Sequence, residues 1–371
     1  MLDFKVRPFF SCSVLVTAVA VLAGQAVAAP VVLNHSFESG ALNAFPGYGP
    51  VQNWSLTGNT GNNDATGPFN NGLTIPNGSR IGFMQGAGAS FTQTVTGFEP
   101  GKAYSVRYLE NERGLPTAEA RHEVSLGGSI VVPGKNITRT DAYRRVQSQA
   151  FTATSASHDL VLSNVAGGVG DNALLLDFVE VTRAVPIVGN GGFDDFGLAP
   201  TAFQYNPLDP SVAWSFTGGG GVSRNGSGFQ SLNADTIEGQ QVGFIQGAGS
   251  ASQVITGFEV GATYSFRWLE QSRGGAGGND LDVLIDGVSV FGSHIVNDQL
   301  WNSQTSNDFI ATSSSLTLSL VSTNPQGGDR TVFVDDGFFN FVAEPVPEPS
   351  SIVLMGLAFV GLVGYGWRKR R

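Results

Sequence analysis

Cysteine is almost missing from this chain of 371 residues, since Cys12 is the only one. It lies near the N-terminus, where Lys5 and Arg7 precede an apolar run. Ala26-Val27-Ala28 then gives the small-x-small pattern at which signal peptides are cut. We therefore interpret residues 1–28 as a signal peptide. The protein left after cleavage has no cysteine, so disulfide bonds are excluded and a hydrophobic core must hold the fold together.

Positive charge is also scarce. The chain has 20 Lys and Arg residues against 30 Asp and Glu residues, a formal net charge of −10, and several of the basic residues lie in its two ends. A chain with this balance repels nucleic acid and anionic lipid surfaces. It suits divalent cations and neutral polysaccharide, and we expect no nucleic acid partner.

Enzyme motifs are missing as well. The sequence contains no His-Glu-x-x-His, no Gly-x-Ser-x-Gly and no P-loop. The four histidines are scattered, and none has a counterpart in the internal repeat described next; they are His35, His122, His158 and His294. We predict that the protein is not an enzyme. A carboxylate pair acting on a glycan stays open, because the separation of two carboxylates is a property of the fold and not of the sequence.

No long stretch with the 3.6-residue period of a helix appears between the two ends, and the segments found there occur twice. The second set follows the first in the same order along the chain. The clearest pairs are Ile81–Gly88 with Val242–Gly249, Thr96–Glu99 with Thr256–Glu259, and Tyr104–Glu110 with Tyr264–Glu270. We predict two copies of one domain, named here copy one (residues 29–184) and copy two (residues 185–343).

Each copy has the pattern of β-structure. Tyr104, Val106 and Tyr108 alternate with other residues at the period of two that is typical of a strand. Asp286-Gly287 separates two apolar runs and suits a two-residue hairpin turn, and Gly127-Gly128 has the same place in copy one. We predict an all-β protein of two tandem antiparallel jelly-roll β-sandwich domains, with a C-terminal transmembrane helix after them.

Each copy resembles the galactose-binding-like jelly rolls of many carbohydrate-binding modules. The copies open on Asn34-His-Ser-Phe-Glu38 and on Asn190-Gly-Gly-Phe-Asp194, and Trp54 or Trp214 follows. A Gly-x-Gly…Gln stretch, the hairpin turn and a closing strand with Asp complete the resemblance. It implies non-catalytic binding of carbohydrate, which we expect to be the cell's own exopolysaccharide. The alternative is a structural component of the extracellular matrix that self-associates without a specific glycan.

The resemblance also implies a structural calcium ion between the ends of the first and last strands. Glu38 and Asp177 would contribute in copy one, and Asp194 with Asp335 or Asp336 in copy two. Hard carboxylate oxygens are the ligands that calcium prefers. Copy two is the more acidic copy, so any difference between the copies should favour it. The alternative is that these carboxylates face water at the strand ends.

Two sets of charged residues recur in the repeat and are candidates for ligand binding. The sets are Arg107, Glu110 and Arg113 in copy one, and Arg267, Glu270 and Arg273 in copy two. If the aromatic face of this strand points inward, the first arginine of each set points outward. A guanidinium and a carboxylate can bond paired sugar hydroxyls. The alternative is a local Arg–Glu salt bridge that fixes the end of the strand.

Aromatic residues fall into two groups. Trp54 and Trp214 are expected in the two cores, although either could stack on a sugar ring. Tyr48, Phe203 and Tyr205 lie in loops rich in Pro and Gly that differ between the copies. Ligands are usually met by such loops, because a rigid scaffold positions them.

The C-terminal residues 344–371 indicate where the protein is sent in the cell. Pro347-Glu348-Pro349 precedes an uncharged apolar run that is close to the thickness of a bilayer, and the chain ends on Arg368-Lys369-Arg370-Arg371. This pattern resembles the PEP-CTERM sorting tail of Gram-negative bacteria. The resemblance implies processing by an exosortase, an inner-membrane intermediate and a final place at or outside the cell surface. The alternative is a plain membrane anchor.

Overall fold

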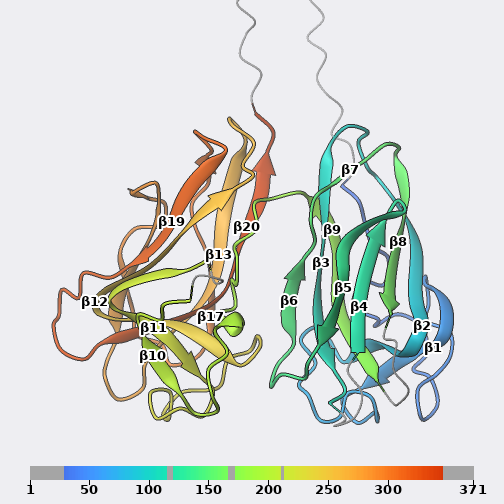
Figure 1. Cartoon of the computed structure of the whole chain (residues 1–371), viewed down its shortest axis with the longest axis horizontal. Coiled ribbons are helices and arrows are strands. Elements are labelled where there is room, and N and C mark those ends of the chain that lie inside the picture. Colours follow the sequence, from blue (N-terminus) through green and yellow to red (C-terminus); the bar gives the residue numbers. More distant parts are fainter. Residues whose placement is uncertain (1–28, 115–119, 166–171, 210–212, 346–371) are drawn as a thin grey trace, which may run out of the picture.

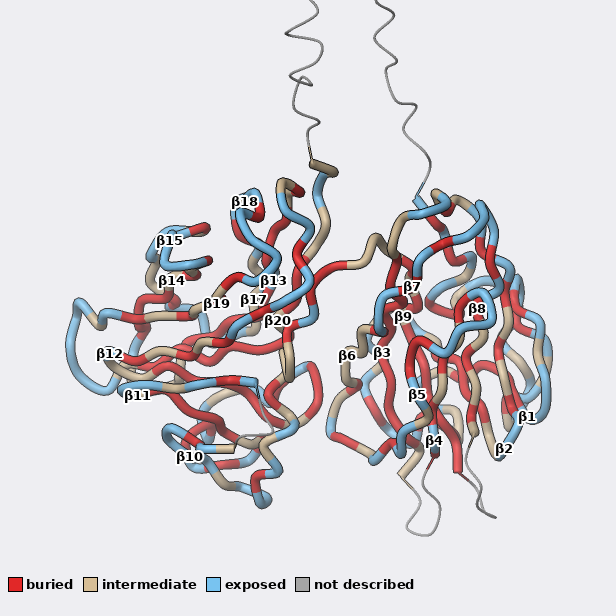
Figure 2. Tube along the Cα trace, turned by 45° about the horizontal axis from the view of Figure 1, so that its top comes forward, coloured by how far each residue is buried: buried red, intermediate tan, exposed pale blue. Residues whose placement is uncertain are grey.

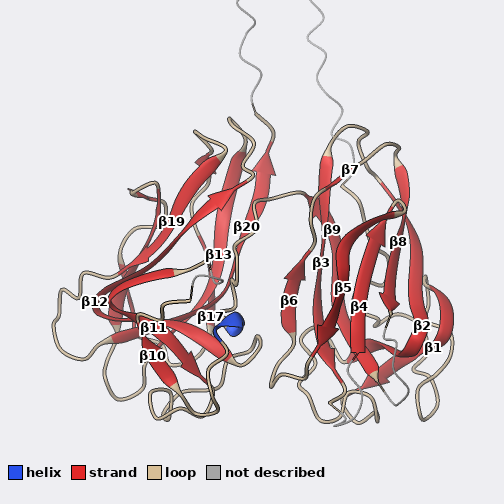
Figure 3. Cartoon of the chain, in the orientation of Figure 1, coloured by secondary structure: helices blue, strands red, loops and turns tan. Residues whose placement is uncertain are grey.

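The computed structural model describes residues 29–114, 120–165, 172–209 and 213–345, so the predicted signal peptide and the sorting tail with Pro347, Glu348 and Pro349 lie outside it. Within these ranges the structure consists of strands, loops and one short 3₁₀ helix, η1 (Asp194–Phe196) (Figure 3). No helix in these ranges has the length and apolar character needed to cross a membrane. The prediction of an all-β fold is confirmed.

Copy one forms a single curled sheet of nine strands in the order β5-β4-β8-β2-β9-β3-β6, with β1 paired to β2 and β7 to β3. All of the pairings are antiparallel. The strands are β1 (Ser55–Asp64), β2 (Arg80–Thr96), β3 (Ala103–Glu112), β4 (Ala120–Leu126), β5 (Ser129–Ile137), β6 (Arg144–Gln147), β7 (Phe151–Thr152), β8 (Ser157–Asn164) and β9 (Ala173–Arg183).

Copy two repeats this sheet strand for strand, in the order β15-β14-β19-β12-β20-β13-β17, with β11 paired to β12 and β18 to β13. Two short strands, β10 and β16, are added at its margins. The strands are β10 (Phe203–Tyr205), β11 (Ser215–Arg224), β12 (Gln241–Thr256), β13 (Thr263–Ser272), β14 (Asn279–Ile285), β15 (Val288–Ser289), β16 (His294–Val296), β17 (Asn302–Thr305), β18 (Phe309–Ile310), β19 (Ser315–Val321) and β20 (Thr331–Ala343).

One long bent strand makes two layers out of each sheet. The first half of β2 pairs with β9, with Gly82 opposite Leu176, and its second half pairs with β8, with Ala89 opposite Asn164. The bend lies at the repeated Gln-Gly-Ala-Gly segment, where φ is 77° at Gly86 and 81° at Gly88. Such positive φ values favour glycine, so this motif encodes the corner of the sandwich.

The core of each copy lies between its two layers (Figure 2). Tyr104, Val106 and Tyr108 point into it and are at most 1% exposed, as the alternation predicted. Trp54 stacks on a buried phenylalanine and donates its indole N–H to the backbone, and Trp214 does the same in copy two. Both tryptophans therefore belong to the cores.

The predicted hairpins are present in both copies. Asp286 and Gly287 join β14 to β15 with φ of 48° and 79°, and Gly127 and Gly128 join β4 to β5 with φ of 57° and 79°. Two successive positive φ values are the geometry of a type I′ turn, whose twist matches that of the strands it joins.

The two copies contact each other along one side of each sheet. Strands β3 and β6 of copy one face β13, β17 and β20 of copy two (Figure 1). Ion pairs cross this contact, among them Arg145 with Asp336 at 2.7 Å and Lys102 with Glu344 at 2.7 Å.

Candidate functional sites

Arg107, a predicted ligand-binding residue, does point away from the core of copy one, but copy two covers it. It is 2% exposed, and its guanidinium donates to the Phe339 carbonyl and to Asn340 Oδ1 (3.2 Å). It also lies 5.0 Å from the centre of the Phe338 ring. Burial lowers the pKa of Arg107 to about 10. This side chain holds the copies together and has no open groove in front of it.

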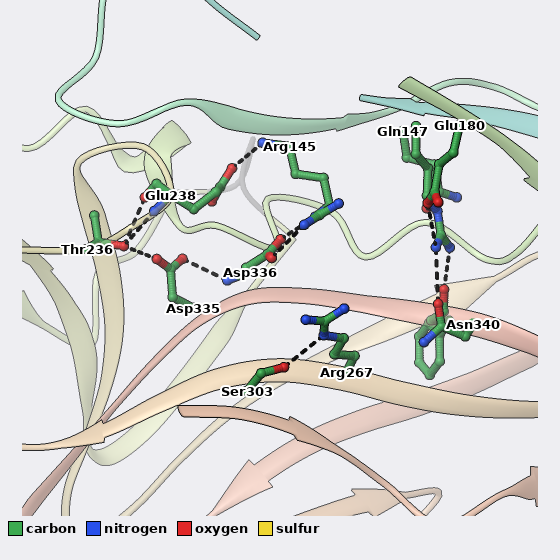
Figure 4. Close-up of polar contacts among 12 residues, drawn as sticks. Arg145, Gln147, Glu180, Thr236, Glu238, Arg267, Ser303, Asp335, Asp336 and Asn340 are labelled. Atoms are coloured by element: carbon green, nitrogen blue, oxygen red, sulfur yellow. Dashed lines mark hydrogen bonds and ion pairs between the residues drawn. The ribbon is translucent and has the colours of Figure 1, made fainter. Parts of the chain in front are cut away.

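Arg267, the counterpart of Arg107, is exposed and lies at the same contact. Its Nε donates to Ser303 Oγ at 2.9 Å, and its guanidinium lies 5.6 Å from the centre of the Phe338 ring (Figure 4). The structure therefore brings the first arginines of both sets to one phenylalanine between the copies.

Glu110 lies inside copy one, on the face of β3 that carries the core residues. It is 0% exposed, 2.9 Å from His122 Nδ1 and 2.9 Å from Lys135 Nζ, whereas Arg144 approaches only to 4.0 Å. Burial alone would raise the pKa of Glu110, but the hydrogen bond from His122 and the charge of Lys135 outweigh it and lower the pKa to about 2.

Glu270 has an equivalent environment in copy two that is built from other strands. Its carboxylate lies 2.8 Å from His294 Nε2 and accepts from the Trp268 indole N–H at 2.8 Å and from Gln304 at 2.9 Å. His294 lies on β16 opposite β14, just as Lys135 lies on β5 opposite β4. The histidines are unmatched in the sequence repeat, as predicted, but His122 and His294 reach equivalent glutamates from different strands.

The third arginine of each set lies on a separate surface. The guanidinium of Arg113 stands 4.8 Å from the centre of the Phe69 ring, and that of Arg273 stands 4.0 Å from the Phe229 ring. The three residues of each predicted set therefore serve three places: the contact between copies, the interior, and a ring on the outer face of the sheet.

Tyrosines and glutamines that match between the copies complete this outer surface. Tyr48 is 39% exposed and Tyr205 is 40% exposed, and each hydroxyl donates to a glutamine Oε1, that of Gln85 or of Gln246. Both glutamines belong to the repeated Gln-Gly-Ala-Gly segment. The two tyrosines also pair with equivalent positions, Tyr48 with a glycine of β1 and Tyr205 with a glycine of β11.

We name these surfaces the tyrosine sites. Each consists of a half-exposed tyrosine set edge-on against a phenylalanine, with the glutamine and the arginine around it. The members are Tyr48, Gln85, Phe69 and Arg113 in copy one, and Tyr205, Gln246, Phe229 and Arg273 in copy two.

The two tyrosine sites differ at their margins. In copy one a hollow of about 370 Å³ lies between Tyr48, Pro50, Leu56 and Asn59. In copy two Phe203, which is 45% exposed, stacks on the Phe229 ring at 5.0 Å.

The predicted calcium ligands of copy one already accept hydrogen bonds. Glu38 Oε1 accepts from two backbone N–H groups, those of Ser79 (2.7 Å) and Arg80 (2.6 Å), and Oε2 accepts from the Ser79 hydroxyl. Asp177 accepts from the backbone N–H groups of Asn77 (2.8 Å) and Phe178 (2.7 Å). Burial raises the pKa of Asp177 to about 8.

Copy two has carboxylate oxygens without such partners. Asp194 Oδ1 accepts from the backbone N–H of Gln240 at 2.8 Å, but Asp194 Oδ2 is buried and finds no hydrogen-bond partner in the described part of the chain. Glu238 is 6% exposed, and its Oε2 is orphaned in the same way. Burial raises the pKa of both carboxyls, that of Asp194 to about 7, and their mutual repulsion raises the pKa of Glu238 further.

Asp335 and Asp336 point to different partners (Figure 4). Asp335 is buried beside Glu238 and accepts from the Thr236 hydroxyl, and burial raises its pKa well above the usual value. The Arg145 guanidinium donates to both carboxylate oxygens of Asp336, from Nε to Oδ1 at 2.7 Å and from Nη2 to Oδ2 at 3.0 Å.

Asp194 and Glu238 each leave one buried carboxylate oxygen without a hydrogen-bond partner, and either a proton or a cation would satisfy it. Among the described residues, however, no group of three or more His, Cys, Asp or Glu side chains is placed to hold a metal ion. Sequence reasoning missed Glu238. In copy one the matching position is Asn77. The glycine that follows, Gly78 or Gly239, lies against the opening carboxylate of its copy. Because Asn77 is uncharged, comparison of the two copies did not indicate a carboxylate at this position.

Comparisons with known proteins agree with the sequence at the C-terminus. Residues 345–371 match the family described as the PEP-CTERM protein-sorting motif. No curated protein matches the chain.

Solved structures similar to this chain include carbohydrate-binding modules. One is the tandem CBM22-1–CBM22-2 of Paenibacillus barcinonensis Xyn10C, with 13% identity over 85% of this chain and 97% of that chain and a TM-score of 0.29. Another is module CBM36, solved with calcium and xylotriose, with 18% identity over 32% and 87% and a TM-score of 0.25. A Paenibacillus xanthan lyase is similar over 80% of this chain and 28% of its own, with 14% identity and a TM-score of 0.29. At these identities the similarities say nothing about what this chain binds.

Proposed function

We propose that the protein is exported and binds polysaccharide without catalysis, through the tyrosine sites of both copies. The observation that carries this proposal is the recurrence of the same four side chains in the same arrangement. Core residues recur because both copies fold alike, but the repeat of a half-exposed tyrosine in segments of different sequence favours a shared role.

The chemistry of the tyrosine sites suits a sugar. The exposed part of an aromatic ring fits the C–H face of a pyranose, and the neighbouring amide and guanidinium supply donors for its hydroxyl groups. In copy two, Asp329 lies 3.2 Å from the Arg273 guanidinium and also bonds Gln246. That arginine is therefore neutralised, and with the acidic balance of the whole chain this favours neutral polysaccharide over uronate polymers.

A glycan array with residues 29–345 tests the proposal. Tyr48→Ala and Tyr205→Ala should each lower the apparent affinity for a bound polysaccharide at least about tenfold, because two linked sites bind with avidity, and the double variant should not bind. Ile130→Ala changes an exposed side chain of β5, which pairs with β4 and not with the strand that Tyr48 contacts, and it is the matched control. Self-assembly of the wild-type protein without any glycan signal would favour the matrix alternative and contradict this proposal.

We also propose a structural calcium ion in copy two, held by Asp194 and Glu238 with Asp335 beside them. When bound, the ion would supply the positive charge that the orphaned oxygens need. Chelator should then lower the melting temperature, and Asp194→Asn should remove most of that response. Asp177→Ala measures the contribution of copy one. Equal melting of the calcium-free and calcium-loaded forms would contradict a calcium site in either copy.

A further inference from the structure

A hollow in copy one opens directly beside Tyr48. Its volume is about 370 Å³, and Tyr48 itself forms one wall. Pro50, Trp54 and Leu56 give it apolar walls, and Asn59 adds an exposed side-chain amide. Clefts that bind small molecules begin at about 300 Å³ and combine apolar walls with a few polar groups. The hollow therefore has the size and the lining of a small binding site.

The residue after each tyrosine holds the same backbone position in both copies. The Gly49 N–H donates to the Thr60 carbonyl at 3.2 Å, and the Asn206 N–H donates to the Gly220 carbonyl at 2.9 Å. Both acceptors lie one residue before the glycine that pairs with the tyrosine. Gly49 and Asn206 are therefore structural counterparts, although the copies differ in sequence here.

Copy two fills the corresponding space with its own side chain. The Asn206 amide donates from Nδ2 to the Gly218 carbonyl at 3.0 Å. Gly218 matches Gly58, which lines the hollow of copy one, because each lies at the register shift of its strand. In copy two a polar group of the chain thus occupies the place that copy one leaves open.

Backbone geometry keeps this place open in copy one. At Gly49, φ is 139°, a value that residues with side chains rarely adopt, and an added Cβ would lie 3.0 Å from Asn43 Oδ1. A larger residue at this position would be strained, so this wall of the hollow stays bare. Asn206, in contrast, has a φ of 45°, which asparagine tolerates.

We propose that the hollow binds a second sugar unit of the polysaccharide, next to the unit that stacks on Tyr48, and that copy two lacks this subsite. The inference rests on the proposed binding of polysaccharide at the tyrosine sites and deepens it. The apolar walls receive the C–H face of the ring, and the Asn59 amide bonds its hydroxyl groups. A hydroxyl over Gly58 takes the place that the Asn206 amide has in copy two. The two copies then bind the same polysaccharide with footprints of different size.

Affinity electrophoresis of the mature chain in gels that contain xylan, β-mannan, β-glucan or galactan tests the subsite. A Tyr205→Ala background leaves the tyrosine site of copy one. In this background Asn59→Ala should weaken retention about fivefold, because a sugar hydroxyl loses its partner. Thr57→Ala is the matched control, since Thr57 is an exposed residue of the same strand that does not line the hollow, and it should leave retention unchanged.

Asn59→Trp gives an independent test in the same background. Its indole would fill the hollow, so retention should fall at least about tenfold, whereas Thr57→Trp should change nothing. Unchanged retention of both Asn59 variants, or an equal loss in the Thr57 controls, would overturn the subsite and leave the binding at Tyr48 standing. A loss in Asn59→Trp alone would show obstruction of Tyr48 and would also overturn it. No retention of the wild type in any of the gels would contradict the tyrosine sites and the subsite together.

Discussion

At the scale of single residues, Glu110 shows how this fold carries a buried charge. The carboxylate is fully enclosed, yet His122 and Lys135 reach it from two different strands. The histidine is enclosed as well, and burial lowers the pKa of His122. Both lowered pKa values reduce the stability of the folded state relative to the unfolded state at acidic pH.

The pH dependence of stability follows from these shifts. The pKa of Glu110 falls from 4.5 in the unfolded chain to about 2, so its contribution is present above pH 4.5 and is lost as the pH falls toward 2. Unfolded His122 takes up a proton below its usual pKa of 6.5 while the folded form resists, which adds a loss in the same direction.

The raised pKa values of Asp177 and Asp194 act in the opposite direction and stabilise the folded state as the pH falls from about 8 to about 4. We therefore expect the loss carried by Glu110 to show in the melting temperature below pH 4.5, where Glu110→Gln should have a flatter slope than the wild type. Thermal melts at steps of pH check this. An equal slope in the variant would assign the acid sensitivity to other groups.

Trp214 gives a second prediction for a single residue. It is 4% exposed, stacks on Phe193 and donates its N–H to the Asn190 carbonyl. Trp214→Ala should lower the free energy of unfolding by about 3–5 kcal/mol, as for other large core residues. Urea unfolding measures this loss. Unchanged stability together with lost glycan binding would instead make Trp214 a ligand-binding residue.

The core tryptophans could be predicted from the sequence, but the tyrosine sites could be predicted only in part. Trp54 and Trp214 occupy the same place in a matched segment, so the repeat itself indicated a shared role. Tyr48 lies in a loop and Tyr205 lies on β10, and only the pairing with equivalent strands shows that they match. Glu238 had no counterpart in copy one and gave no signal at all.

At the scale of the elements, period-two alternation and turn chemistry predicted the strands and hairpins correctly, because both depend on neighbours in sequence. The added strands β10 and β16 lie at margins where no repeat exists for comparison. β16 brings in His294, so the pair of His294 with Glu270 in copy two could not be predicted from local pattern.

The hairpin between β14 and β15 offers a test of turn chemistry. At Gly287, φ is 79°, and an added methyl group would meet nothing within 4 Å. Gly287→Ala should therefore cost about 1 kcal/mol through backbone strain alone. Gly228→Ala, where φ is ordinary and space is equally open, is the control and should cost nothing. Equal melting temperatures for both variants would contradict the strained turn.

At the scale of the whole molecule, the arrangement of the copies depends on residues that the repeat does not share. Asp336 binds Arg145 across the contact, whereas Phe178 occupies the matching place in copy one. A comparison of the copies therefore predicted their folds but not how they meet.

The sorting tail makes a prediction about the fate of the protein. Glu348 is the centre of Pro347-Glu348-Pro349 within the matched residues 345–371, so Glu348→Ala should keep the chain in the membrane fraction, while Glu344→Ala, just before the matched residues, should be released normally. Fractionation with an antibody to copy one measures both. Normal release of the Glu348 variant would contradict exosortase processing.

The ion pairs of Glu344 fix the end of the molecule from which the C-terminal segment leaves. Lys102 and Arg183 hold this residue at 2.7 and 2.6 Å, so the chain leaves from a fixed point, and residue 29 begins at the same end of the molecule (Figure 1). β1, which pairs with Tyr48, and β10, which contains Tyr205, lie toward the other end of the molecule (Figure 1). If the sorting tail holds the chain in the membrane and the tyrosine sites bind polysaccharide, as proposed, both sites face away from the membrane and can bind polysaccharide before the tail is removed.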